Sequence, residues 1–112
     1  MTDANTHERI RLDVQTNDVV LYMKGTPDFP QCGFSARASQ ILRMCNVKYK
    51  PVDVLADAAI RQGIKDFSNW PTIPQLYVKG EFVGGSDIMT EMYQSGELQQ
   101  LLADKGVATD AA

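Results

Sequence analysis

Cysteine and histidine are scarce in this chain of 112 residues, which restricts the chemistry available to it. The two cysteines, Cys32 and Cys45, are too few for a disulfide scaffold or for a zinc site contained within one chain. Such sparing use of cysteine is typical of a reducing compartment. The single histidine, His7, lies close to the N-terminus, where we expect it to be solvated rather than to act as a ligand.

The sequence also lacks an excess of positive charge and any long apolar run. Eleven Lys and Arg against fourteen Asp and Glu give a net charge of -3, which argues against non-specific binding to nucleic acid. No apolar run approaches the roughly 18–20 residues of a membrane helix, and residues 1–9 have no apolar segment of the kind found in a secretory signal. We therefore expect a cytoplasmic protein that binds neither nucleic acid nor membrane. The mitochondrial matrix is the alternative if the chain is a trimmed mature form.

The patterns that are present predict a single α/β domain over 1–112, with a core over about 8–104. The run Val19–Met23 is wholly apolar, as in a strand covered on both faces, and Lys79-Gly80 has the form of a two-residue hairpin turn. The tail over 106–112 has weak signals, and we expect it to fray. The expected helices cover about 6–15, 33–45, 56–67 and 87–104 with a break near 95–96, and the expected strands cover 19–23, 49–54, 75–78 and 81–83. This order predicts a four-stranded mixed sheet with helices on both faces, a thioredoxin-like fold.

Cys32 is the principal candidate for chemistry, because it follows a loop and stands at the expected start of a helix. Unpaired backbone N–H groups and the helix dipole favour negative charge at that position. Both effects lower the pKa of a thiol and expose the thiolate, which is the nucleophile and the metal-binding form. Lys24, at the end of the preceding strand, can add a positive charge nearby. A loop flanked by Pro30 and Gly33 is a poor place for the alternative, a buried structural cysteine.

Cys45 is predicted to be a small core residue, because it lies on the apolar face of the same helix. Cys45 is thirteen residues from Cys32 in the sequence, which corresponds to about 20 Å of helix, whereas a disulfide needs Cα atoms within about 7 Å. Cys32-Gly33-Phe34-Ser35 has the spacing of a C-x-x-C redox motif with serine in the fourth place. Since Ser35 cannot resolve a mixed disulfide, a second thiol has to come from outside the chain.

Four motifs in order give the chain a specific resemblance over about Glu8 to Asp104. They are Lys24-Gly25-Thr26-Pro27, Cys32-Gly33-Phe34-Ser35, Trp70-Pro71-Thr72-Ile73-Pro74-Gln75 and Gly84-Gly85-Ser86-Asp87. Together they resemble the monothiol glutaredoxins of the CGFS type. The resemblance implies a single glutaredoxin domain that binds glutathione and assembles a 2Fe–2S cluster between two subunits.

The same resemblance implies cationic partners for the ligand. Lys24 matches the family lysine near the reactive thiol, and Arg61 matches the arginine that holds the glycine carboxylate of glutathione. Forked guanidinium donors suit that group. Lys65, one turn further along the helix, is a weaker candidate, and for both residues of the pair the alternative is a solvated helix face.

Two further segments are implied to contact glutathione. A cis bond before Pro74 would turn the Ile73 backbone toward the peptide backbone of the ligand, with a trans turn as the alternative. Ser86 and Asp87 begin the last helical stretch, where free N–H groups can bind the γ-glutamyl carboxylate and Asp87 can accept from the adjacent ammonium. The alternative is a simple N-cap by either residue. Trp70 is expected to pack rather than to contact the ligand.

The function that we expect follows from counting thiolates. A 2Fe–2S cluster needs four donors, and one chain supplies only Cys32 while one glutathione supplies a second. Two chains and two glutathiones complete the set, which implies a homodimer and a labile cluster suited to iron–sulfur assembly and transfer. By resemblance, the partners are apo iron–sulfur client proteins and a BolA-like protein. The alternative is an enzyme, a glutathione-dependent thiol–disulfide oxidoreductase acting through Cys32, with weak activity at most.

Overall fold

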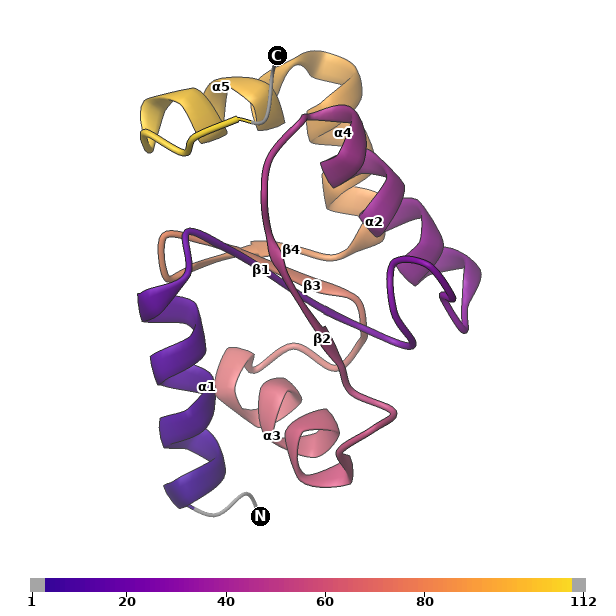
Figure 1. The fold of residues 1–112 in the computed structure, drawn as a ribbon, viewed down its shortest axis with the longest axis vertical. Coiled ribbons are helices and arrows are strands. Elements are labelled where there is room, and N and C mark those ends of the chain that lie inside the picture. Colours follow the sequence, from indigo (N-terminus) through magenta and orange to yellow (C-terminus); the bar gives the residue numbers. More distant parts are fainter. Residues whose placement is uncertain (1–3, 110–112) are drawn as a thin grey trace.

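A computed structural model describes residues 4–109 and shows the mixed four-stranded sheet that the sequence predicts. The helices are α1 (Ala4–Thr16), α2 (Gly33–Met44), α3 (Ala58–Ser68), α4 (Ser86–Ser95) and α5 (Glu97–Asp104), and the strands are β1 (Val19–Met23), β2 (Lys50–Asp53), β3 (Gln75–Val78) and β4 (Glu81–Gly84). The strand order is β2-β1-β3-β4, with β1 parallel to β2 and antiparallel to β3, and with β3 antiparallel to β4. Helices α1 and α3 cover one face of the sheet, and α2, α4 and α5 cover the other (Figure 1).

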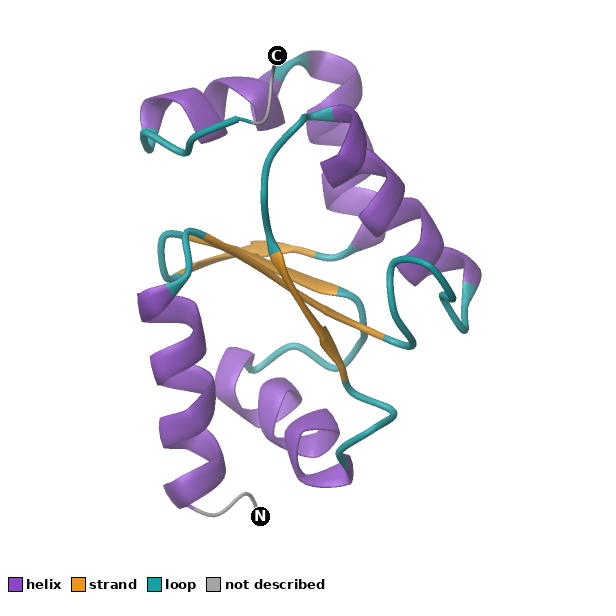
Figure 2. Ribbon diagram, in the orientation of Figure 1, coloured by secondary structure: helices purple, strands orange, loops and turns teal. Residues whose placement is uncertain are grey.

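Strand β1 separates two apolar clusters, which explains its unbroken run of apolar residues. All five of its side chains are buried, and successive side chains point to opposite faces of the sheet. Val19, Leu21 and Met23 pack with residues of α2, α4 and α5, whereas Val20 and Tyr22 pack with residues of α1 and α3. Figure 2 shows the sheet as the middle layer between the two sets of helices.

Local turn chemistry sets several element boundaries. Lys79 and Gly80 both have positive φ, of 50° and 82°, as a tight hairpin turn of the predicted kind requires. Gly96, with φ 84°, stands between α4 and α5, where the break was expected. Helix α3 begins at Ala58 because Asp57 caps it, with the side chain accepting the N–H groups of Ala59 and Ile60. No helix within residues 4–109 is long and apolar enough to cross a membrane.

The start of the C-terminal tail differs from our expectation that 106–112 frays. Gly106, with φ 71°, donates its N–H to Ala103, and Val107 donates to Leu102. This pair of bonds is a Schellman motif, which ends α5 and folds the chain back. Val107 is only 8% exposed and packs in the cluster beneath α5, and Thr109 pairs with Val47. Residues 110–112 of that prediction lie outside the part of the chain described.

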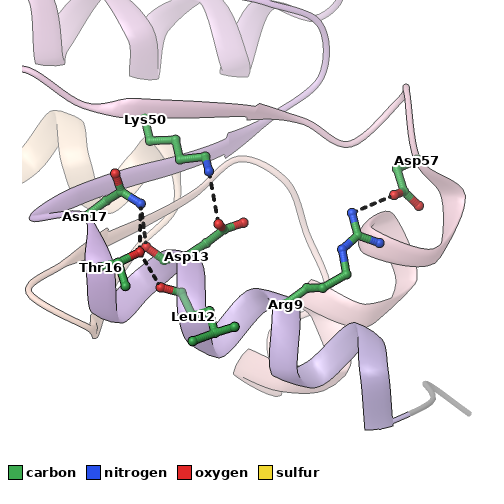
Figure 3. A network of polar contacts seen from close by, with 7 residues as sticks. All are labelled: Arg9, Leu12, Asp13, Thr16, Asn17, Lys50 and Asp57. Atoms are coloured by element: carbon green, nitrogen blue, oxygen red, sulfur yellow. Dashed lines mark hydrogen bonds and ion pairs between the residues drawn. The ribbon is translucent and has the colours of Figure 1, made fainter.

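Two ion pairs connect α1 to neighbouring elements, one to the N-cap of α3 and one to strand β2 (Figure 3). Arg9 contacts the α3 cap Asp57 at 3.0 Å, and Asp13 contacts Lys50 of β2 at 3.0 Å. Exposed pairs of this kind add little to stability. The docking of α1 therefore depends mainly on the buried side chains Ile10 and Val14.

The packing of α5 makes a stability prediction. Leu98 is fully buried in the cluster beneath α2, α4 and α5, so Leu98→Ala should lower the free energy of unfolding by about 2–5 kcal/mol. Leu12 of α1 is 51% exposed, so Leu12→Ala is the matched control and should change it by less than about 0.5 kcal/mol. Urea denaturation followed by circular dichroism measures both. Equal effects of the two substitutions would contradict this placement of α5.

Candidate functional site

Cys32 is the N-cap of α2, as its position in the sequence predicts. Its backbone is extended, with φ -153° and ψ 153°, and its Sγ accepts the N–H of Ser35 at 3.3 Å. Its carbonyl accepts the N–H of Ala36 at 3.0 Å and so starts the helical ladder. The sulfur thus takes the place of the side-chain oxygen that usually caps a helix, and it remains partly exposed.

The hydroxyl of Ser35 is the second polar group at the sulfur. Its Oγ lies 3.3 Å from Sγ of Cys32 and accepts the backbone N–H of Lys24 at 3.0 Å. Because the oxygen already has this donor, the hydroxyl proton is free to point at the sulfur once the thiol ionises. Ser35 is wholly buried, so its hydroxyl connects the Lys24 backbone to the partly exposed Cys32 sulfur from the protein side.

The pKa of the Cys32 thiol is held below its ordinary value. Partial burial by itself raises this pKa. Hydrogen bonds from the Ser35 hydroxyl, the Ser35 N–H and the Phe34 N–H outweigh it, and the charge of Lys24 acts in the same direction. The direction and the part played by Lys24 agree with the sequence prediction, which did not include the hydroxyl of Ser35.

A closed loop carries the chain from β1 to α2. Thr26 and Phe29 exchange backbone hydrogen bonds of 3.3 and 3.1 Å, and Gln31 donates its N–H to Lys24 at 2.9 Å. Gly25, at the base of the loop, has φ +90°, and a Cβ on it would lie 2.5 Å from the carbonyl oxygen of Phe29. Only glycine fits there, so the loop reaches α2 along a tightly defined path.

A cavity of about 420 Å³ opens next to this thiol and is lined by the two runs 70–74 and 85–88, by Phe34 and by two lysines. Lys24 and Phe34, which both act on the Cys32 thiol, are part of its wall. Cys32 itself is not among the lining residues. The lining consists of Lys24, Phe34, Lys65, Trp70, Pro71, Thr72, Ile73, Pro74, Gly85, Ser86, Asp87 and Ile88.

The N-terminus of α4 faces this cavity without a side-chain cap. Gly85 is the N-cap and has no side chain to bond the first turn, so the alternative in which Ser86 or Asp87 caps the helix is wrong. Ser86 is 6% exposed, and its Oγ has no hydrogen-bond partner within residues 4–109. Free N–H groups and an unpaired hydroxyl together suit a bound anion, with the Asp87 carboxylate beside them.

A second wall of the cavity is the loop before β3, which lies against Gly85, and Gln75 holds this loop in place. The Ile73–Pro74 peptide bond is cis, as expected. Gln75 is fully buried, and its amide donates to the carbonyls of Trp70 and Thr72 at 3.2 Å each. Trp70 packs against Phe82, with ring centroids 5.9 Å apart, and also lines the cavity. Its expected packing role is present, and the expectation that it does not contact the ligand stays a prediction.

The basic pair on α3 divides between the cavity and the solvent. Lys65 is half-buried and lines the cavity, whereas Arg61, one turn earlier, is exposed and does not line it. The sequence predicts the other order for these two residues, with Arg61 above Lys65 as a contact of the ligand. The assignment of Arg61 to a ligand carboxylate stays a prediction.

The remaining candidate residues take structural places. His7 is half-buried rather than solvated, with its ring edge-on to Phe67 at a centroid distance of 6.0 Å, because it shares a helix face with Ile10. Cys45 packs against the core as predicted, and burial raises the pKa of its thiol. Between residues 4 and 109, no three or more His, Cys, Asp or Glu side chains gather as a metal site would require.

Comparison with known proteins assigns this arrangement to a family. Residues 19–83 match the glutaredoxin family. A protein of Synechocystis named as an uncharacterized monothiol glutaredoxin is 60% identical over 100 residues, which cover 88% of this chain and 94% of that protein. Glutaredoxin 4 of Escherichia coli is 50% identical over 101 residues, covering 90% and 88%. The chain belongs to the monothiol glutaredoxin family.

Solved glutaredoxin structures confirm the thioredoxin-like fold. The solution structure of reduced apo GrxS14 from poplar is 49% identical, with a TM-score of 0.77 over 88% of this chain and 90% of that one. A monomeric truncated mutant of 1-C-Grx1 from Trypanosoma brucei is 40% identical, with a TM-score of 0.86 over 100% and 98%.

Ser35 and Gln75 are the residues of this glutaredoxin site that sequence reasoning missed. Ser35 was considered only as the absent second thiol. Gln75 was named only as the last residue of a motif and the start of a strand, although a polar residue within a strand that is otherwise buried has to find hydrogen-bond partners. That burial pattern was the available signal for Gln75. For Ser35 the signal was its place three residues before Ala38, on the buried face of α2.

The hydroxyl of Ser35 can be tested separately from its backbone. Ser35→Ala should move the pH profile of Cys32 alkylation by iodoacetamide to higher pH and slow the reaction at pH 7 by about 3- to 10-fold. Peptide mass analysis separates Cys32 from Cys45. Ser39→Ala is the control, because Ser39 is buried on the same helix but bonds Tyr49. A profile unchanged by Ser35→Ala would contradict thiolate stabilisation by this hydroxyl.

Proposed function

We propose that this glutaredoxin binds glutathione in the cavity beside Cys32 and carries a labile 2Fe–2S cluster between two copies of the chain. The observation that carries the proposal is one thiol of lowered pKa beside a cavity that ends in an uncapped helix N-terminus. In this view the cluster is cargo in iron–sulfur assembly and transfer.

The polar groups of the cavity match those of glutathione, which has two carboxylates, one ammonium group and a thiol. The N–H groups of the first turn of α4 and the buried Ser86 hydroxyl suit one carboxylate. The carboxylate of Asp87 suits the ammonium. Lys24 and Lys65 line the cavity as cations for the second carboxylate, and Arg61 extends that cationic side along α3. The backbone of Ile73 is assigned to the peptide part of the ligand.

The donor set of one chain fits a shared cluster and not an enclosed one. Cys45 packs against the core on the far end of α2, and no other cysteine exists in the sequence. One thiolate per chain therefore has to be joined by three further donors. Two glutathione thiols and the Cys32 of a second copy complete four, and exchangeable donors make the cluster easy to pass on to apo client proteins. A BolA-like protein remains a predicted alternative partner.

The partly exposed thiol of Cys32, with its lowered pKa, also supports a second function, the removal of glutathione from proteins. The Cys32 thiolate would attack the glutathione sulfur of a mixed disulfide and displace the protein thiolate. A second glutathione thiolate would then attack the Cys32–glutathione disulfide, releasing glutathione disulfide and restoring Cys32. Ser35 cannot take the place of that second thiol.

Reconstitution of the two cysteine variants tests the proposed function. Anaerobic treatment of the wild-type chain with ferrous iron, sulfide and glutathione should give a visible cluster spectrum, about two irons per two chains, and a dimer by sedimentation. The apo chain should be a monomer at micromolar concentration, because the cluster links the subunits. Cys32→Ser should abolish both the colour and the dimer, and Cys45→Ser should retain both.

Several outcomes would overturn the carrier proposal. These are a stable apo dimer, a monomer with full iron content, or loss of the cluster in folded Cys45→Ser. A colourless wild-type chain that still reduces a glutathionylated protein would establish the oxidoreductase alternative instead.

The cationic side of the cavity makes a separate prediction. Arg61→Ala should weaken glutathione binding by about 1.5–3 kcal/mol, or roughly 10- to 150-fold, because a guanidinium–carboxylate contact is lost. Arg43→Ala, on the last turn of α2, is the control and should bind as the wild type does. Calorimetry measures both, with Lys65→Ala alongside. An unchanged affinity for Arg61→Ala together with a loss for Lys65→Ala would transfer the role to Lys65.

A further inference from the structure

The carboxylate of Asp53 joins the end of β2 to the end of β1. Its Oδ1 accepts the N–H of Gly25 and the N–H of Leu55, each at 2.9 Å. Asp53 stands opposite Met23 in the parallel register, and Val54 donates its N–H to Met23 at 2.9 Å. The two strands therefore end at the same level of the sheet. Gly25, to which Asp53 bonds, is the second residue after β1 and directly follows Lys24.

Lys24, the residue before Gly25, makes backbone hydrogen bonds to residues on both sides of Cys32. The carbonyl of Lys24 accepts the N–H of Gln31 at 2.9 Å, and the N–H of Lys24 donates to Oγ of Ser35 at 3.0 Å. Gln31 precedes Cys32 in the chain, and Ser35 bonds its sulfur. The backbone at Lys24 is in turn held by β1 on one side and by the Gly25–Asp53 bond on the other.

We propose that Asp53 is a positioning residue for Cys32, acting through Gly25 on the Lys24 backbone. The Asp53 carboxylate does not touch the sulfur. It fixes the Lys24–Gly25 peptide, whose carbonyl accepts the Gln31 N–H. It thereby holds Lys24, the residue that carries the ammonium group and donates its N–H to the Ser35 hydroxyl oxygen. The requirement is for an acceptor atom at Oδ1 and not for negative charge, because both of its partners are backbone N–H groups. The inference rests on Cys32 being the functional thiol, as in the proposed function.

The test measures the reactivity of Cys32 in the full chain with iodoacetamide, without glutathione or iron. Asp53→Ala removes the acceptor, so alkylation of Cys32 at pH 7 should slow by about 3- to 10-fold and its pH profile should move to higher pH. Asp53→Asn keeps an acceptor oxygen and loses the charge, so it should restore the wild-type profile. Asp53→Leu replaces Asp53→Ala if the latter does not fold, because it fills similar space without an acceptor.

Asp57 supplies a matched control for a merely structural role. Its carboxylate also accepts two backbone N–H groups, at the start of α3, but has no bond to the loop among those the structure describes. Asp57→Ala should lower stability to urea and leave the alkylation profile unchanged. The proposal is overturned if Asp53→Ala behaves like Asp57→Ala, or if Asp53→Asn slows alkylation as much as Asp53→Ala does. If the chain bound neither glutathione nor a cluster, the effect of Asp53 on Cys32 alkylation would still hold. The two proposals can therefore be refuted independently.

Discussion

The backbone of one residue, Lys24, ties the end of the central strand to the start of α2. Its carbonyl bonds the residue before Cys32, and its N–H bonds the hydroxyl that contacts the sulfur. β1 is fully buried between two helical layers, so its end is fixed by packing. The loop starts from that fixed position and is itself held by its internal hydrogen bonds and by the glycine at position 25, so the core and the loop together place the thiol.

The two walls of the cavity beside the thiol differ in how their polar groups are satisfied. The wall before β3 is held by the side chain of Gln75, which spends both amide donors on carbonyls of that wall. The α4 wall leaves its first-turn donors and the Ser86 hydroxyl unused by the protein. One wall is thus satisfied internally and the other is open to a ligand, which gives the cavity a polarity that suits an anionic end group.

The sequence predicted the features whose causes are local or periodic. The buried strand Val19–Met23, the turn at Lys79-Gly80 and the helix start at Cys32 each depend on a few adjacent residues. The missed features depend on residues that are distant in the chain or on the details of packing. Nothing in the neighbourhood of Asp53 indicates a bond to Gly25, 28 residues away, and nothing near Val107 indicates its packing beneath α5. The ranking of Arg61 above Lys65 followed the family resemblance and stays a prediction, although Lys65 and not Arg61 lines the cavity.

The sulfur of Cys32 is at once the reactive atom and the cap of α2, and the two roles reinforce each other. A thiolate accepts the N–H of Ser35 better than a thiol does, so ionisation strengthens the first turn of the helix. Because the folded-state pKa is lowered, the folded state gains stability as pH rises from that lowered value toward the ordinary thiol value, and it loses this gain on acidification. Many reactive groups are held at the expense of the fold. In this chain the chemically competent form of the thiol is also the form that the fold prefers.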